Sequence, residues 1–541
     1  MKTLRVLLSI SIFAIILSAG HNEDNKKSKL SKVTVTGETA RMDINNIDLA
    51  LTNDGQTGND ADSFYPKGTD LSFLFSGGVC FSGYVEGDLR TAWMAPASRI
   101  QEMQPGNLGS DPDALEYVFY TVNSSDSFGS DNYNKWADAV AIGADFFDAD
   151  GDGEYDPNID TPDILGDRTL WCVYNDSVPA TSRDMLNTGA LGLEVRQSIW
   201  AFEKSDALGD VVFIRYRVVN ASENDIDDLI ISGWTDPDIG NATDDLIGCD
   251  TTLNLGYIYN FQDDNEYGAN PPAFGIDFIQ GPIVDSPGDT AFHINGLLMG
   301  TDTILNHKNL GMTSFMYMTS WGGVITYPAT KEIARYYQEG GLDAEGEPII
   351  ASDWGIGGDS HSDVRYFFSG DPVTQTGWLD NTPQDIRFLI NSGPFQLKAG
   401  ERQDIIIAYI VTQGSSALNS VTKLKATSLF LNDLFPFKDP VTGLNDEFED
   451  KKIPISFQLE QNRPNPFNPQ TVIRYELPVN SKINITVYGA LGRKVKTLIN
   501  RRQTAGSHQV VFNGANMASG VYYYRLQAEN FVDTYKMLLI K

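Results

Sequence analysis

The sequence predicts a mainly β protein, in which a β-sandwich-like body with few helices precedes a smaller C-terminal β-sandwich. Short apolar or alternating runs recur between clusters of Gly, Asn, Asp and Pro, as in sheets joined by tight turns. The 541 residues are 41% hydrophobic and 11% aromatic, which is enough for several domains with large cores. Acidic residues outnumber basic residues by 72 to 40, and this charge is unevenly distributed.

The charge distribution separates a basic tail from an acidic remainder. Residues 451–541 hold 13 Lys and Arg and 4 acidic residues, a net charge of +9, so the total of −32 leaves −41 on the rest of the chain. Such asymmetry indicates modules with different roles. The strongly negative surface argues against nucleic acid and anionic lipid as partners, because both would be repelled.

The N-terminus has the pattern of a secretory signal peptide, which we expect to span residues 1–20. Lys2 and Arg5 precede an apolar run, Val6–Leu17, and small residues follow at 18–20. The apolar run is too short to span a bilayer, which takes about 20 residues. We expect a polar linker at 21–32, no transmembrane segment in the mature chain, and a location outside the inner membrane.

Residues 33–436 are expected to form the acidic β-rich body, as one domain or as two packed subdomains. Val211–Val219 alternates, with Arg215 and Arg217 on one face, and Ile405–Val411 is continuously apolar, as in a strand buried on both faces. Further strands are predicted at 229–234 and 388–390. Helices are predicted at 132–146 and 418–435, the second because apolar residues recur at helical spacing before a proline.

An acidic loop at residues 148–156 has the spacing of a calcium-binding loop. Carboxylates at its first, third and fifth positions converge because the loop curls, and a glycine at the sixth position permits the sharp turn. Ile159 stands where a bidentate Glu is usual, so a later carboxylate must complete the shell. The alternative is a solvated acidic turn. The predicted calcium ligands are Asp148, Asp150, Asp152, Glu154 and Asp156, with Asp160 or Asp163 in addition.

A second acidic cluster follows the predicted strand at 229–234. It matches no compact loop template, and Pro237 and Gly240 are equally typical of a loop between strands. It is a weaker candidate for metal, with carboxylates at Asp236, Asp238, Asp244, Asp245 and Asp250.

Signatures of catalysis and of redox or zinc chemistry are absent from the sequence. There is no HExxH, GxSxG or phosphate-loop motif, and the five His residues are dispersed. No catalytic residue is therefore predicted. Cys80, Cys172 and Cys249 allow at most one intramolecular disulfide, and their pairing is left open.

The last module, residues 456–541, follows an expected linker at 437–455. Alternating runs at 471–477, 482–488, 509–512, 521–527 and 534–540 predict a small immunoglobulin-like sandwich. This tail resembles the type A C-terminal sorting domain of the type IX secretion system of Bacteroidota, and the same fold is similar to the immunoglobulin-like module of flagellar hook-capping proteins. The residues that carry the resemblance are Asn465, Pro466, Phe467, Asn468, Pro469, Gly492, Arg493, Gly506, Gly520, Tyr522, Arg525 and Lys536.

The resemblance implies export across the outer membrane, with the tail recognised by the secretion machinery. We expect a secreted or cell-surface protein without enzymatic activity, whose calcium-stiffened body binds a glycan or a surface protein or has a structural role. The alternative is a secreted hydrolase of polysaccharide or protein, because such tails also accompany enzymes. A subunit of an ordered extracellular layer is a third interpretation.

Overall fold

The computed structural model describes most of the chain beyond its N-terminus. The described residues are 38–59, 62–98, 100–183, 188–296, 300–319, 325–434, 457–459, 461–477, 481–489, 492–503, 506–514, 517–528 and 531–540. The predicted signal peptide (1–20) and the predicted linkers (21–32 and 437–455) lie outside these residues. The chain divides into two compact units, Met1–Thr442 and Gly443–Lys541, and each is considered by itself.

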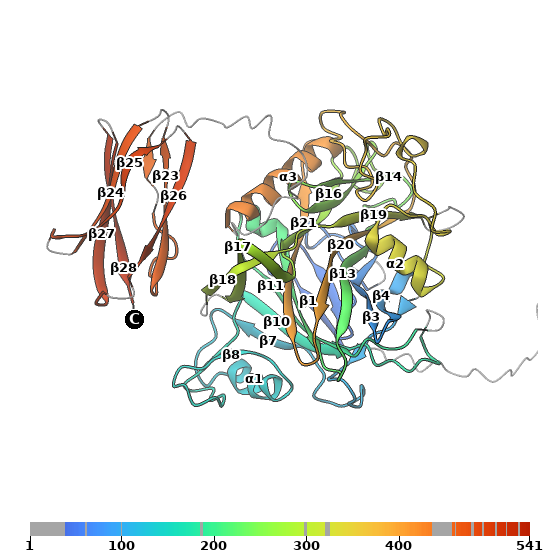
Figure 1. Cartoon of the computed structure of the whole chain (residues 1–541), viewed down its shortest axis with the longest axis horizontal. Coiled ribbons are helices and arrows are strands. Elements are labelled where there is room, and N and C mark those ends of the chain that lie inside the picture. Colours follow the sequence, from blue (N-terminus) through green and yellow to red (C-terminus); the bar gives the residue numbers. More distant parts are fainter. Residues whose placement is uncertain are drawn as a thin grey trace, which may run out of the picture. The chain divides into compact units, whose positions relative to one another are not determined.

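The body is built on two large antiparallel sheets (Figure 1). In its described residues the larger sheet has nine strands and the smaller has six. In spatial order the larger sheet contains β14 (Asp245–Asp250), β15 (Leu255–Asn260), β16 (Pro272–Gln280), β21 (Arg402–Gln413), β12 (Val211–Asn220), β11 (Leu193–Ala201), β10 (Arg168–Asn175) and β6 (Gln104–Pro105), and β7 (Tyr120–Asn123) also pairs with β10. The smaller sheet contains β19 (Ser314–Thr319), β20 (Ile386–Leu397), β13 (Ile226–Asp236), β3 (Ser76–Val85), β4 (Asp88–Ala95) and β5 (Ile100–Gln101).

Shorter elements complete the body. The strands β17 and β18 pair as a long hairpin, which follows β16 and precedes β19 in the chain. The bounds of these elements are β1 (Thr39–Met42), β2 (Leu49–Thr52), β8 (Phe146–Phe147), β9 (Thr161–Pro162), β17 (Ile283–Gly296), β18 (Gly300–Asn309), and the short 3-10 turns η1 (Pro96–Ser98), η2 (Ala207–Asp210) and η3 (Ala351–Asp353).

The two large sheets pack face to face around one hydrophobic core. Phe81 of β3, Ile231 of β13, Ile214 of β12 and Tyr409 of β21 are fully or almost fully buried in the same cluster. The Tyr409 ring meets Phe274 edge-on at 5.3 Å between centroids. Because both sheets contribute their inward-facing residues to this cluster, the predicted β-sandwich-like body is confirmed.

Helices cover parts of the outer faces. The helix α3 (Ala417–Leu434) packs Val421, Leu424 and Leu431 on the outer face of β16 and β21. The helix α1 (Asp131–Ala141) packs Trp136 near Trp171 of β10. Both helices were predicted, and α1 ends earlier than the predicted residue 146 because the chain turns into β8. The sandwich buries Ile405–Val411 from both sides, as predicted.

One helix, α2 (Lys331–Glu339), was not predicted. It begins at Thr330, whose side chain accepts a hydrogen bond from the Ile333 N–H, and it ends at Gly340 with a φ of 77°. It packs Ala334 and Tyr337 on the smaller sheet. The sequence did not indicate this helix because two residues of its buried face, Arg335 and Gln338, are polar and interrupt the pattern of apolar residues.

The tail unit consists of two antiparallel sheets around a separate core. Residues of both sheets share a cluster that includes Phe467, Tyr475, Ile485 and Tyr524. One sheet has the order β22 (Gln458–Leu459), β23 (Gln470–Leu477), β26 (Gly506–Asn513), and the other β25 (Lys494–Gln503), β24 (Ser481–Gly489), β27 (Gly520–Ala528), β28 (Phe531–Leu539). The five predicted strands are present, and two more are added to them. These are the two-residue strand β22 and β25, whose Lys and Arg residues obscured the alternation.

Candidate functional site

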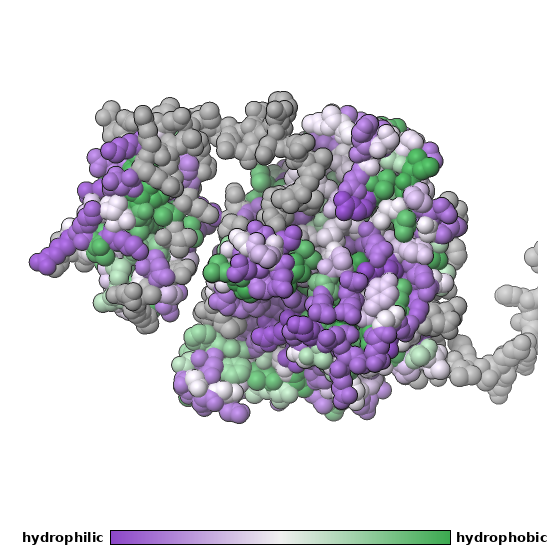
Figure 2. Space-filling model, in the orientation of Figure 1, coloured by the Kyte–Doolittle hydropathy of each residue, from purple (hydrophilic) through white to green (hydrophobic). Residues whose placement is uncertain are grey.

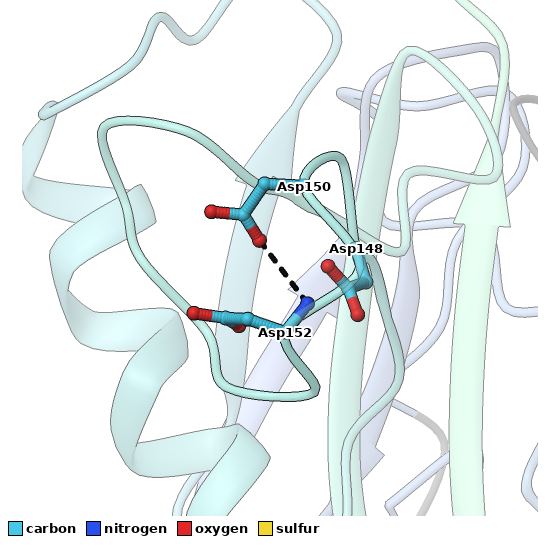
Figure 3. A group of neighbouring side chains, drawn as sticks. All are labelled: Asp148, Asp150 and Asp152. Carbon is cyan, nitrogen blue, oxygen red and sulfur yellow. Dashed lines mark hydrogen bonds between the residues drawn. The ribbon is translucent and has the colours of Figure 1, made fainter.

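The predicted calcium loop forms the connection between β8 and β9, and its carboxylates converge (Figure 3). One oxygen from each of Asp148, Asp150 and Asp152 lies within 4.8 Å of the others. The Asp148 carboxylate accepts hydrogen bonds from the Gly151 N–H (2.6 Å) and the Gly153 N–H (3.0 Å). Both glycines have positive φ, 78° and 83°, which closes the loop. These backbone donors hold the pKa of Asp148 below its usual value.

The remaining predicted ligands divide between the loop and a different contact. Asp160 is buried at the base of the loop and accepts hydrogen bonds from the Ala149 and Asp156 N–H groups, both at 2.8 Å. Asp156 accepts from the Asn158 N–H at 2.8 Å, and Glu154 donates its own N–H to Asp152. Asp163 instead forms a buried ion pair with Arg215 of β12.

The loop therefore offers a set of hard oxygen atoms of the kind that calcium prefers. Three carboxylates point toward a common space, and Asp160 fixes the loop ends from beneath. The pKa of Asp150 is raised, first by partial loss of solvent around it and then by the neighbouring carboxylates Asp152, Asp160 and Asp148. A divalent cation at this place would relieve that repulsion.

The second predicted acidic cluster is separated into several contacts. Asp236 and Asp238 come together with Asp385, which the sequence did not single out, within 4.8 Å. Asp244 accepts a hydrogen bond from Asn260, Asp245 accepts from the Ile239 N–H, and Asp250 forms an ion pair with Lys425 at 3.1 Å. The five residues therefore do not form one site.

Arg387 already places a positive charge within the Asp236 group. Its guanidinium contacts Asp236 at 2.9 Å and also pairs with Asp385. Burial raises the pKa values of Asp236 and Asp238, and Asp385 raises both further. Asp385 could not be found by spacing, because the pairing of β13 with β20 brings it near Asp236 from 149 positions away in the sequence.

A cavity of about 310 Å³ opens beside the smaller sheet, and no motif in the sequence indicated it. Tyr317, Trp354 and Phe368 give it aromatic walls, and the Trp354 ring meets Tyr317 edge-on at 5.9 Å. Tyr317 and Phe368 are buried, whereas Trp354 is partly exposed. The polar residues that line it are Thr319, Asp353, Asp380, Thr382 and Gln384.

Two of these polar residues are held in fixed orientations. The Gln384 amide donates to the Tyr317 hydroxyl at 2.6 Å. Asp380 accepts from the Ile247 and Thr382 N–H groups, both at 3.1 Å. Burial raises the pKa of Asp380 to about 6 in spite of these hydrogen bonds. The cavity thus combines an aromatic surface with hydrogen-bonding groups that are already positioned.

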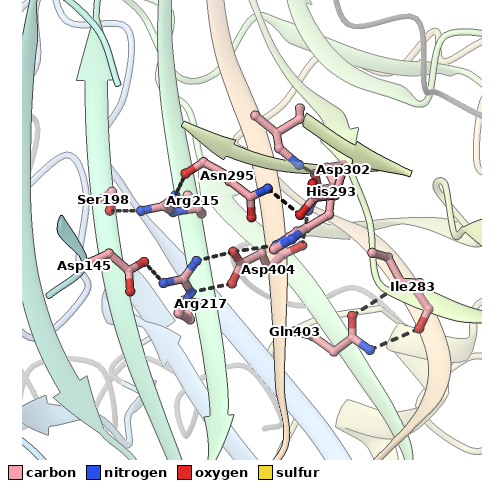
Figure 4. A network of polar contacts seen from close by, with 12 residues as sticks. Asp145, Ser198, Arg215, Arg217, Ile283, His293, Asn295, Asp302, Gln403 and Asp404 are labelled. Carbon is pink, nitrogen blue, oxygen red and sulfur yellow. Dashed lines mark hydrogen bonds and ion pairs between the residues drawn. The ribbon is translucent and has the colours of Figure 1, made fainter. Parts of the chain in front are cut away.

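The outer face of β12 contains a buried network of charges (Figure 4). Arg217 lies opposite Asp404 of β21 and binds it through two hydrogen bonds of 2.7 and 2.6 Å, and it also pairs with Asp145. His293 Nε2 of β17 is 2.9 Å from the same Asp404 carboxylate. These hydrogen bonds, together with the charges of Arg217 and Arg215, hold the pKa of Asp404 far below its usual value against the opposing effect of burial. The network joins the hairpin to the sheet.

The three cysteines of the body form no disulfide. Cys80, Cys172 and Cys249 are free and buried, and burial raises the pKa of each thiol. Figure 2 shows a largely hydrophilic face, with hydrophobic residues in the region of α1. Leu115 and Phe128 are among the exposed hydrophobic residues. Among the described residues, no helix has the length and apolar character needed to cross a membrane.

The tail motif holds the chain entry against the last strand. The Asn465 side chain accepts from the Leu538 N–H at 2.8 Å, and the Phe467 backbone bonds to both Leu538 and Ile540. Phe467 itself is buried against Phe512. Other motif residues have turn or surface positions. Gly492 and Gly520 have positive φ, and Arg493 and Lys536 are exposed. The Arg525 guanidinium lies over the Tyr488 ring, and the Tyr522 hydroxyl donates to the Ala518 carbonyl.

Residues 463–541 match the family model described as a secretion system C-terminal sorting domain. The tail is therefore a type IX sorting domain, which implies export through the type IX machinery to the cell surface or the medium. Its immunoglobulin-like topology, and the roles of its individual motif residues, remain predictions.

Comparisons of the whole chain with solved structures find distant similarities. Solved structures with partial similarity are a polysaccharide lyase (9% identity, TM-score 0.20, covering 64% of this chain and 34% of that one), the adhesin domain of Epf from Streptococcus pyogenes (7%, 0.13, 69% and 90%) and dimeric latent PorU from Porphyromonas gingivalis (11%, 0.14, 69% and 31%). The chain spans about a third of the length of the lyase. No curated protein sequence matches.

Proposed function

We propose that the body is a non-enzymatic glycan-binding module that the type IX tail delivers to the cell exterior. The observation that carries the proposal is the aromatic cavity at Trp354. A partly exposed indole can stack on the apolar face of a sugar ring, while carboxylates and amides accept and donate the hydrogen bonds of its hydroxyl groups. The cavity has this combination, and its volume of about 310 Å³ suits one or two sugar units.

The fixed orientation of the cavity groups supports this proposal. Gln384 donates to the Tyr317 hydroxyl, which leaves that hydroxyl free to donate its own proton to a ligand. Asp353 is exposed at the rim, where its carboxylate is able to accept from sugar hydroxyls. A binding site whose polar groups are positioned before the ligand arrives loses less conformational entropy on binding.

We further propose that calcium binds the loop at 148–160 and stiffens it. The convergent oxygens of Asp148, Asp150 and Asp152 support this proposal, and the hydrogen bonds of Asp160 at the loop base make the site pre-formed. A site that exists only in the folded protein stabilises it by mass action, by about 2.7 kcal/mol when free calcium exceeds the dissociation constant 100-fold.

A secreted hydrolase is the second candidate, because one observation favours it. Asp380 has a pKa raised to about 6 and lines the same cavity as Asp353, and a carboxyl group near neutrality suits general acid catalysis. An observation against this candidate is that both Asp380 oxygens accept hydrogen bonds from backbone N–H groups, those of Ile247 and Thr382. These hydrogen bonds give Asp380 a structural role in joining the two segments.

An array of neutral oligosaccharides, probed with the full chain in calcium-containing buffer, tests the proposal. We expect saturable binding to at least one glycan, with no shortening of that glycan on prolonged incubation. Trp354→Ala should abolish the binding, whereas Ile356→Ala, a matched truncation of an exposed apolar side chain that does not line the cavity, should retain it. Cleavage of the bound glycan that Asp380→Asn eliminates would establish the hydrolase instead.

A further inference from the structure

A second cavity, of about 520 Å³, lies between the β17–β18 hairpin and the start of β21. Ile283, Val284 and Ile304 form an apolar part of its wall. The remainder is polar and strongly charged, and the hairpin is tied to β21 there by the Gln403 side chain, which bonds to both backbone groups of Ile283 (Figure 4). The charged residues that line it are Asp285, His293, His307, Lys398, Glu401, Arg402 and Asp404.

Each acidic residue of this cavity already has a basic partner. Asp404 is bound by Arg217 and His293, as described above. Asp285 lies 3.0 Å from His307 Nε2, and Glu401 lies 3.7 Å from Lys398 Nζ. Asp404 and Glu401 therefore each have a cationic partner, and Asp285 has a histidine as its neighbour.

Arg402 differs from the other charged groups of the cavity. Its guanidinium forms no hydrogen bond or ion pair with any described residue, although it is exposed within reach of acidic neighbours. It lies instead in a region rich in arginine: the charge of Arg217 is the largest cause that lowers its pKa, burial and the charges of Arg196 and Arg215 act in the same direction, and the charge of Asp404 opposes them. A guanidinium that several cations repel, and that forms no ion pair with a described carboxylate, gains more than usual from a bound anion.

We propose that this cavity binds a sugar carboxylate, the uronate group of an acidic glycan, with Arg402 as its anchor. A single unpartnered guanidinium matches one planar carboxylate, which it can bind through two parallel hydrogen bonds. A phosphate with two charges would meet only this one unpartnered guanidinium, so its second charge would be left without a partner.

The remaining wall fits the rest of a sugar. Asp285 and Glu401 still have lone pairs for hydroxyl donors after their ion pairs are counted, and the three aliphatic residues can cover the C–H face of the ring. The His293 side chain also lines this cavity, and its Nε2 lies 2.9 Å from the Asp404 carboxylate. This combination of one anion site with several hydroxyl sites favours a uronate over an acidic peptide.

The uronate site shares no lining residue with the aromatic cavity, so the two proposals can fail separately. The test is calorimetric titration of the full chain with a trisaccharide of galacturonic acid, and with the neutral galactose trisaccharide as the comparison ligand. We expect the uronate to bind and the neutral sugar to bind at least tenfold more weakly. Arg402→Gln should reduce the uronate affinity tenfold or more, the usual effect of losing a hydrogen bond to a charged group.

Three controls separate anchoring from general charge and folding effects. Lys204→Gln removes an equal charge from an exposed place outside the cavity and should leave the affinity unchanged. Because Arg402 is exposed and unpartnered, Arg402→Gln should keep the thermal midpoint of the wild type. Uronate binding by the wild type should also weaken as salt is added, which requires no variant.

Three results would overturn the proposal: equal uronate affinity of Arg402→Gln and wild type, no uronate binding at low salt, or equally tight binding of a triglutamate peptide. The last result would assign the cavity to acidic peptides.

Discussion

Replacement of Asp404 by Asn should destabilise the body strongly, because it leaves the charge of Arg217 buried with a weakened partner. The two side chains are 1% and 5% exposed, and their hydrogen bonds are 2.7 and 2.6 Å long. Removing one member of a buried pair costs about 3–5 kcal/mol. Asp145 still contacts Arg217 after the change, so we expect the low end of that range, about 3 kcal/mol.

Urea unfolding followed by tryptophan fluorescence measures this loss. All eight Trp residues precede residue 443, so the signal of the full chain reports on the body alone. Lys331→Met is the matched control, because Lys331 pairs with the exposed Asp88 and such surface pairs contribute about 0–1 kcal/mol. The double variant Arg217→Met/Asp404→Leu should recover most of the lost stability, because an apolar pair needs no charge compensation.

The pH dependence has a definite sign. The folded pKa of Asp404 is depressed, so its contribution is present above the unfolded value of about 3.9 and is lost as the pH falls below that value. The difference between wild type and Asp404→Asn should therefore shrink below about pH 4. The reasoning is refuted if Asp404→Asn costs no more than Lys331→Met, or if the double variant is less stable than Asp404→Asn.

Three further predictions concern the loop, the cavity and the tail. Calcium should raise the thermal midpoint of the wild type and of Asp263→Asn, an exposed control, but not of Asp150→Asn; equal midpoints in calcium and in EGTA would remove the calcium site. Burial raises the pKa of Asp380 to about 6, so this group favours folding below about pH 3.9 and that contribution is lost as the pH rises through 6. The free energy of unfolding of Asp380→Asn should therefore rise relative to that of the wild type between pH 4 and 7, by up to about 3 kcal/mol. If urea titrations at pH 4 and pH 7 give the same difference between the two proteins, the raised pKa of Asp380 is contradicted. A chain that ends at Asp450 lacks the sorting domain and should stay inside the outer membrane on cell fractionation, whereas its appearance outside would show a second export signal.

The fold could be predicted where the local pattern and the tertiary packing agree. Val211–Val219 and Ile405–Val411 alternate or run apolar as central strands must, and both are neighbours in the larger sheet. The alternation correctly placed Arg215 and Arg217 on one face, but it did not indicate that this face is buried. Burial there depends on partners from distant segments, among them Asp163 and Asp404, and no local pattern encodes such partners.

The candidate sites also differ in how far the sequence alone could predict them. The convergence of carboxylates in the loop at 148–156 could be predicted because Asp148, Asp150 and Asp152 lie within a few residues and the glycines fix the turn. The aromatic cavity could not, because Tyr317, Trp354 and Asp380 come from separate segments that only the sheet pairing assembles. The sequence spacing of the acidic residues that follow Asp236 was also misleading. Asp385 joins Asp236 and Asp238 in one group, whereas Asp244 does not.

The central claim, that the body binds glycans at Trp354, is tested most directly by the indole N–H resonances of the full chain labelled with nitrogen-15. Trp354→Ala identifies the resonance of that residue by its disappearance. The account predicts that titration with an oligosaccharide selected on the array shifts this resonance saturably, with the same dissociation constant as the array binding. Saturable binding that leaves the Trp354 resonance unmoved would contradict it.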